Sequence, residues 1–188
     1  MTVSNFDTDA EEYIIRWGWK YNPSFNPIVK QQVDDFYVVT GDGERLNDVL
    51  GPIKVNTRFA TENRTTEWTS SNDELEHWEL VSQRPPRSDY YVQSNTSGAA
   101  DIFGNTEDFT VDGSILAVGV VARAMKTDID DREIGLVIDV DGTRKEIIDP
   151  DMSTDFKYHM AFFDTDVNGE EWTVDKIKAT GFGVIVRP

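Results

Sequence analysis

The sequence predicts an all-β fold, namely an antiparallel jelly-roll-like β-sandwich with an N-terminal extension and one short helix near the C-terminus. Three observations predict it: short apolar runs with a two-residue period, frequent turn residues between them, and few segments with a helical period. Many short strands separated by turns are typical of two antiparallel sheets packed face to face.

The clearest strand pattern lies between Gly113 and Val140, where two apolar runs flank a charged link at 126–131. The first run, 115–124, is apolar on both faces, which predicts a strand inside a sheet. The second, 134–140, places its apolar side chains at every second position. Asp141-Gly142 then predicts a tight hairpin turn, and a third run follows at 143–148. We expect the three runs to form a meander.

The remaining elements are shorter. Residues 77–81 (HWELV) alternate and predict a strand, as do residues 156–162 and 182–186. Thr173 is a predicted N-cap for a helix over 174–179, because its hydroxyl can accept a hydrogen bond from the first turn. Gly181 ends that helix.

A break at Gly51-Pro52 predicts two parts, an N-terminal extension over 1–51 and a β-sandwich over 52–188. The extension contains an aromatic segment at 13–27, YIIRWGWKYNPSFNP. It is either an edge strand and turn packed on its own domain, or an anchor for a neighbouring subunit, since aromatic side chains dominate buried interfaces. The candidate interface residues are Tyr13, Trp17, Trp19, Tyr21 and Phe25.

Composition excludes several classes of protein. The formal charge of -17 argues against nucleic-acid binding, because phosphates would approach a carboxylate-rich surface. The absence of cysteine removes disulfides, thiol nucleophiles and thiolate metal sites. No apolar run approaches the ~20 residues that span a bilayer, so we expect a soluble protein that does not bind membranes.

One acidic loop has the spacing of a calcium-binding loop, with Asp164, Asp166 and Asn168 at positions one, three and five, and Asp175 at position twelve. Three features oppose this interpretation: a strand precedes the loop, the twelfth residue is not a glutamate, and Glu171 occupies a position that is normally apolar. The other interpretation is a polar turn, with no cofactor in the protein.

The sequence contains no recognisable catalytic set. Its histidines, His77 and His159, both fall in strand-like runs, and neither a nucleophile elbow nor a phosphate-binding glycine loop is present. We therefore expect a protein that is not an enzyme. Aromatic residues could instead form a sugar-binding face, although their alternation favours the core; they are Trp68, Trp78, Tyr90, Tyr91 and Trp172.

Several sequence blocks, taken in order, resemble a group of small tailed-bacteriophage virion proteins with a concanavalin-like jelly-roll sandwich. The blocks are EWTSSN, HWELVSQRPPRSDYYVQS, SGAADIFG, GSILAVGVVARAMKTDIDDREIGLVI and FKYHMAFFDTDVNGEEWTVDKIKATGFGVIV. They lie between about Glu67 and Val186, a span of about two-thirds of the chain. The chain departs from the group at Asp166-Val167, where the group usually has Asp-Pro, and residues 1–51 have no match.

The resemblance implies a structural role in a virion and carries no catalytic residue. We expect a capsid decoration or cement protein on the outside of the phage head, in contact with the major capsid protein or other virion subunits. A homo-oligomer, such as a trimer, is expected. The alternative is a tail-associated or fibre-tip domain that recognises a host glycan.

Overall fold

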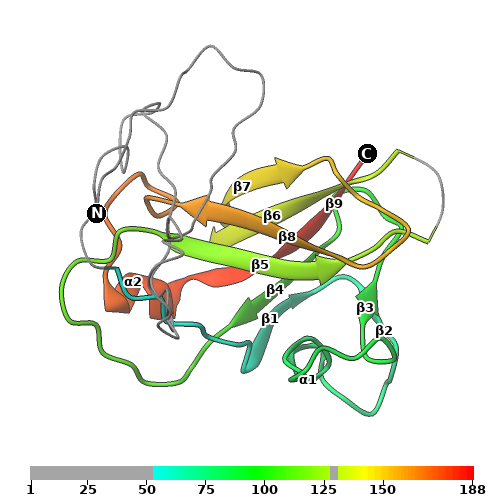
Figure 1. Cartoon of the computed structure of the whole chain (residues 1–188), viewed down its shortest axis with the longest axis horizontal. Helices are drawn as coiled ribbons and strands as arrows, with labels where there is room; N and C mark the ends of the chain where they lie inside the picture. The colour runs from blue at the N-terminus through cyan, green and yellow to red at the C-terminus, as the bar shows by residue number, and fades with distance from the viewer. Residues whose placement is uncertain (1–52, 128–130) are drawn as a thin grey trace, which may run out of the picture. The chain divides into compact units, whose positions relative to one another are not determined.

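The computed structural model describes residues 53–127 and 131–188 (Figure 1). The chain divides into two units, Met1–Phe36 and Tyr37–Pro188, and every described residue belongs to the second. The predicted boundary at residue 51 and the five candidate interface residues of segment 13–27 lie outside the described residues. Within those residues, no helix is long and apolar enough to cross a membrane.

The described part of the chain is all-β and antiparallel, as predicted, with nine strands and two helices. The strands are β1 (Glu62–Thr66), β2 (Thr69–Ser70), β3 (Val92–Gln93), β4 (Ala100–Gly104), β5 (Val118–Ala124), β6 (Glu133–Val140), β7 (Thr143–Asp149), β8 (Lys157–Phe163) and β9 (Gly181–Arg187). The helices are α1 (His77–Val81) and α2 (Val174–Ala179).

The strands form one large sheet and two small ones. The large sheet has the order β1-β4-β9-β6-β7, and β5 pairs with β8 in a sheet of two strands. Figure 1 shows β5 and β8 crossing in front of β6 and β9 as a second layer. The third sheet pairs β2 with β3, close to α1.

The predicted meander is wrong at its first strand. β6 and β7 form the expected hairpin, with Val140 opposite Thr143, but β5 pairs along its whole length with β8. The link after β5 therefore crosses from one sheet to the other. Apolar periodicity identifies a strand but not its partner, and the partner chosen here lies more than 30 residues further along the chain.

The hairpin turn follows the prediction closely. Asp141 has a φ of 50° and Gly142 a φ of 84°, so both central residues are left-handed. Asp139 supports the turn, because its Oδ1 accepts a hydrogen bond from the Gly142 amide at 3.2 Å. A two-residue turn of this hand matches the twist of the strands it joins.

The main core lies between the two layers. Leu136 and Ile138 of β6 pack there with Val120 of β5, Phe163 of β8 and Trp172, and each of these residues is less than a tenth exposed. A second apolar cluster lies on the opposite face of the large sheet. Its residues are Ala100, Ile102, Val137 and Ile185.

The segment predicted as a strand at 77–81 is helix α1. The helix begins with a reciprocal cap, in which the Glu76 amide donates to the Glu79 carboxylate at 2.9 Å. Asn63 of β1 also caps it, since its Oδ1 accepts from the Trp78 amide at 2.8 Å. A five-residue run is too short for its period to separate helix from strand, and the Glu-x-x-Glu spacing is the signal that indicates the helix start.

Helix α2 agrees with the prediction in its bounds and its cap. The Lys176 amide donates to the Thr173 hydroxyl at 3.2 Å, which satisfies one of the free amides of the first turn. At the other end, Arg64 of β1 donates to the carbonyl of Lys178 at 2.8 Å and to that of Ala179. These bonds attach α2 to the edge of the large sheet.

Candidate functional site

The side of β5 and β8 that faces away from the core is the most unusual surface of the described residues. We call it the outer face, and define it by three positions on each strand. Cross-strand partners align Gly119 with Phe162, Val121 with Met160, and Arg123 with Tyr158. Because alternate residues of a strand share a face, all six lie together.

The outer face is exposed and mainly apolar. Tyr158 is 66% exposed, Phe162 64%, Val121 53% and Met160 52%. The intervening residues of β8 point inward and are buried: His159, Ala161 and Phe163. The strand thus turns a tyrosine, a methionine and a phenylalanine toward solvent, while it buries a histidine, an alanine and a second phenylalanine.

Two side chains organise the ends of the outer face. At one end, the ring of Phe162 lies against Gly119, where a Cβ atom would stand 3.0 Å from Cε1 of the ring. At the other end, the Arg123 guanidinium stacks on the ring of Phe156, 3.8 Å from its centre. The guanidinium supplies a positive charge beside the apolar side chains of the outer face.

A contiguous exposed apolar patch is uncommon in a monomer and marks a surface for a partner. The outer face fits that description, because its four large apolar side chains occupy adjacent positions on two paired strands. The sequence pattern predicted a strand at 156–162 but did not identify which side would face solvent. Residues with this pattern are normally buried, so the pattern does not indicate an exposed face.

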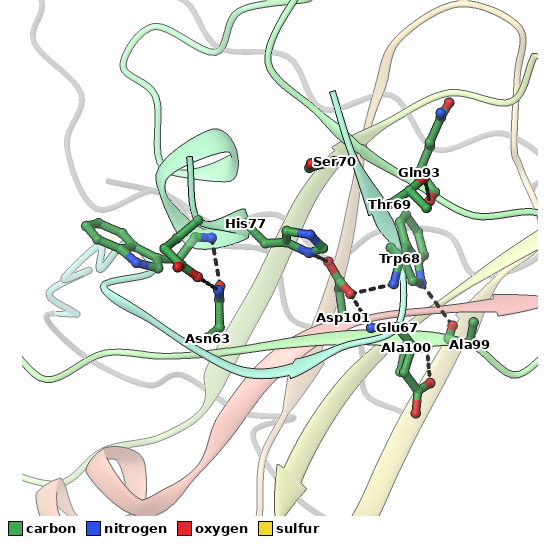
Figure 2. Close-up of polar contacts among 12 residues, drawn as sticks. Asn63, Glu67, Trp68, Thr69, Ser70, His77, Gln93, Ala99, Ala100 and Asp101 are labelled. Atoms are coloured by element: carbon green, nitrogen blue, oxygen red, sulfur yellow. Dashed lines mark hydrogen bonds and ion pairs between the residues drawn. The ribbon is translucent and has the colours of Figure 1, made fainter. Parts of the chain in front are cut away.

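A second notable site is the polar cluster around Asp101 of β4 (Figure 2). Its carboxylate is fully buried, and Oδ1 accepts hydrogen bonds from the amides of Glu67 and Trp68 at 2.9 and 3.0 Å. Oδ2 lies 2.7 Å from Nδ1 of His77, the first residue of α1. One carboxylate therefore joins β4, the chain after β1, and α1.

Burial raises the pKa of Asp101, although the hydrogen bonds from the Trp68 amide and from His77 act in the opposite direction. A histidine held by a buried carboxylate is half of a general-base arrangement. Ser70 lines the same open polar pocket as His77, and its hydroxyl donates to Asp73 at 2.9 Å. The contacts of Asp101 are those of a structural residue.

His159 is a core histidine and, like His77, is paired with a carboxylate. Its side chain is 1% exposed, and Nδ1 lies 2.9 Å from Asp149 of β7. Nε2 is buried without a hydrogen-bond partner. The pair joins the two layers, because β8 belongs to the small sheet and β7 to the large one.

In the loop considered as a calcium site, the amine of a lysine contacts the acidic side chains. Lys176 Nζ lies 2.9 Å from Asp166 and 2.7 Å from Glu170, while Asp166 Oδ1 accepts from the amides of Asn168 and Glu170. Burial acts to raise the pKa of Asp166, but these hydrogen bonds, led by that of Lys176, hold it below its usual range.

The other predicted ligands do not complete a site around Asp166. Asp164 lies 4.0 Å from Lys145, and Asp175 is in the first turn of α2. Among the described residues, no three acidic or histidine side chains gather as a set that could hold a metal ion. The contacts are those of the polar turn, which was the other interpretation of this loop.

The aromatic residues considered for sugar binding do not form one exposed platform. Trp172 is 4% exposed in the main core, where its Nε1 donates to the Phe163 carbonyl at 2.8 Å. Trp68 is half-buried and donates to the Ala99 carbonyl at 3.0 Å. Tyr91 is 41% exposed, and the ring of Tyr90 carries the Arg87 guanidinium.

Comparison with known proteins adds no relative: no protein-family model, curated protein or solved structure matches this chain. The resemblance to phage virion proteins therefore stays a prediction from sequence blocks. The physical features that bear on function are the all-β fold and the outer face.

Proposed function

We propose that this chain is a non-enzymatic structural protein of a tailed-phage virion, a decoration protein that binds the outside of the head through the outer face of β5 and β8. The observation that carries the proposal is the exposure of Val121, Tyr158, Met160 and Phe162 on one side of one small sheet. The virion assignment comes from the sequence resemblance.

Binding through the outer face has a simple energetic basis. Removal of apolar surface from water is favourable by about 25 cal/mol per Å², although the entropy lost on association offsets much of this gain. Aromatic side chains carry a large share of the binding energy at interfaces. A ligand that binds only the assembled shell stabilises that shell by mass action. The negative charge of the chain opposes aggregation through the same apolar surface.

The test uses phage heads assembled without this protein, to which the purified full chain is added. We expect Met160→Lys to lower occupancy of the heads by roughly tenfold or more, because a charge would enter the centre of an apolar contact. Thr143→Lys, at an exposed position of the β6–β7 hairpin, adds the same charge elsewhere and should bind normally.

Equal occupancy by the wild type and Met160→Lys would show that the outer face does not bind the head. Mass spectrometry of purified virions supplies an independent check, since absence of the chain from the particle would overturn the virion assignment itself. A melting temperature of Met160→Lys close to that of the wild type is needed for the comparison. We expect it, because Met160 is 52% exposed.

A further inference from the structure

We propose that two copies of this chain associate through β7, the edge strand of the large sheet, with Ile147 of one copy opposite Ile147 of the other. The two β7 strands run antiparallel and join the two large sheets into one. This interface is separate from the outer face of β5 and β8, so it leaves that face free for the head contact proposed above.

One edge of β7 offers backbone groups to a further strand. β7 is the last strand in the order β1-β4-β9-β6-β7, so among the described residues only β6 pairs with it (Figure 1). Val140 and Thr143 form the hydrogen-bonded pair next to the two-residue turn. Such pairs recur at every second residue, so the amides and carbonyls of residues 144, 146 and 148 point away from β6. An edge of this kind is a template for another chain.

The two isoleucines near the end of β7 are exposed, although they lie on opposite faces of the sheet. Ile147 is 38% exposed and Ile148 47%. Ile147 shares the side of its cross-strand partner Leu136, whereas Ile148 shares that of Gly135. Edge strands are normally protected by charged side chains. β7 has charged residues at 144–146 and apolar ones at 147–148, so its second half is the half open to pairing.

The charges of β7 select one register for this pairing. In a two-fold dimer the residue on the axis faces its own copy. Residues with the same hydrogen-bonding direction must face each other, so the axis passes through a residue and not between two. Centred on Lys145, Glu146 or Ile147, two copies of the seven-residue strand overlap over five residues or more. The first two centres place like charges directly opposite, which is unfavourable. The third places Ile147 against itself.

The register centred on Ile147 also matches the neighbouring side chains. It places Lys145 opposite Asp149 of the second copy, and this pair of opposite charges occurs twice because of the symmetry. The two side chains are 39% and 29% exposed, so both reach the edge of the sheet. Glu146 faces Ile148 of the second copy, and its charge is already balanced by Arg187, whose Nε donates to it at 2.8 Å.

Two-fold pairing of one edge sets the direction of the outer faces. An axis perpendicular to the joined sheet keeps the same face of both copies on the same side. The layer of β5 and β8 then lies on one side of the joined sheet in both copies, and the two outer faces point the same way. This consequence rests on the proposed function: a dimer binds a phage head through two linked contacts, which raises its occupancy above that of a single chain.

Sedimentation equilibrium of the purified full chain measures the association. We expect the wild type to sediment at twice its single-chain mass of 21.3 kDa. Ile147→Lys should sediment as a single chain, because it places two lysines opposite each other at the axis. Met160→Lys is the matched control, since it adds the same charge at an exposed apolar position of the other sheet, and it should remain a dimer. Both variants should melt close to the wild type, because the replaced side chains are 38% and 52% exposed.

Disulfide formation tests the register and does not depend on a disruptive substitution. The protein has no cysteine, so a variant with one cysteine can form a disulfide only between two chains. Directly opposite residues of an antiparallel pair have Cβ atoms about 4.5–5.5 Å apart, close to the separation in a disulfide. Mild oxidation of Ile147→Cys should therefore convert most of the protein to a covalent dimer on a non-reducing gel. Lys145→Cys and Met160→Cys control for random collision and should give little dimer.

Four results would overturn the inference. They are a wild type that sediments at the mass of one chain or of three, an Ile147→Lys variant that remains a dimer, faster covalent dimerisation of Lys145→Cys than of Ile147→Cys, and a Met160→Lys variant that dissociates. The first three leave the proposed function intact if Met160→Lys still loses binding to phage heads. Conversely, a wild-type dimer that Ile147→Lys dissociates, together with unchanged head binding by Met160→Lys, retains the inference and removes the proposed function.

Discussion

The ring of Phe162 lies over Gly119, its partner across the β5–β8 pair, so closely that a Cβ atom at Gly119 would stand 3.0 Å from the ring. The glycine provides the room in which the ring rests on the strand. An aromatic side chain that covers a cross-strand glycine is a recognised means of stabilising such a position in a sheet. The contact shapes one end of the outer face.

We predict that Gly119→Ala changes binding more than stability. The new methyl group meets the side of an exposed ring, which can swing into solvent, so we expect the free energy of unfolding to change by no more than about 0.5 kcal/mol. Displacement of the ring should weaken attachment to phage heads several-fold. A loss of stability above about 2 kcal/mol, measured by urea unfolding, would show instead that the ring is fixed in place.

Adjacent phenylalanines provide a matched pair that tests the orientation of β8. Phe162 is 64% exposed and Phe163 is 1% exposed. We expect Phe163→Ala to lower the free energy of unfolding by about 3–5 kcal/mol, because it leaves a cavity in the core. Phe162→Ala should cost less than about 1 kcal/mol. Similar values for the two variants in denaturant unfolding would mean that the strand does not present these faces.

Substitutions of Asp101 separate its role as an acceptor from its charge. Asp101→Ala leaves the amides of Glu67 and Trp68 without their acceptor, and a buried donor left unpaired costs about 1–3 kcal/mol. Asp101→Asn keeps one oxygen for these amides and should be clearly more stable than the alanine variant. If the two variants unfold at the same urea concentration, the amides have found other partners.

Asp101 and Asp149 should give opposite pH dependences. Burial raises the pKa of Asp101, so its folded form binds the proton more tightly, and its contribution to stability is present below the unfolded value of about 3.9 and is lost as pH rises through the folded pKa. Hydrogen bonds from the Asp151 amide and from His159 lower the pKa of Asp149, so its contribution is present above that value and is lost as pH falls.

The measurement compares each variant with the wild type over a pH series. The stability of the wild type relative to Asp101→Asn should increase on acidification from neutral pH toward 4, whereas that relative to Asp149→Asn should decrease once the pH falls below about 4. Urea unfolding at each pH gives both differences. Two curves of the same sign would contradict the assignment.

We predict that calcium does not stabilise the protein through the loop at 164–175. A cation there would have to displace Lys176, whose amine already neutralises Asp166 and Glu170. Addition of millimolar calcium, or its removal with a chelator, should leave the melting temperature unchanged, with magnesium as the control. A rise in melting temperature with calcium alone would restore the calcium interpretation of this loop.

Local features of the sequence were enough to predict much of the fold. The left-handed turn at Asp141-Gly142 and the helix capped by Thr173 depend on residues close in the chain, and both were confirmed. Apolar alternation located β6, β8 and β9. The class of fold follows from these elements, because short antiparallel strands with frequent turns have few ways to bury their apolar sides.

Helix α1 was missed because its own residues fit either period. Its cap depends partly on Asn63, which lies on another strand. The candidate site was missed for a related reason. A run in which every second residue is apolar predicts that these apolar side chains are buried, and the pattern cannot show that they face solvent instead.

Tertiary structure alone decided the partner of β5 and which side of β8 faces solvent. Pairing with β8 brings together segments far apart in the chain, which no local pattern encodes. The inner side of β8 places Ala161, Phe163 and the Asp149-bound His159 in the space between the two sheets, and Tyr158, Met160 and Phe162 are left outside. The space between the layers, which exists only in the folded chain, therefore determined the exposed surface.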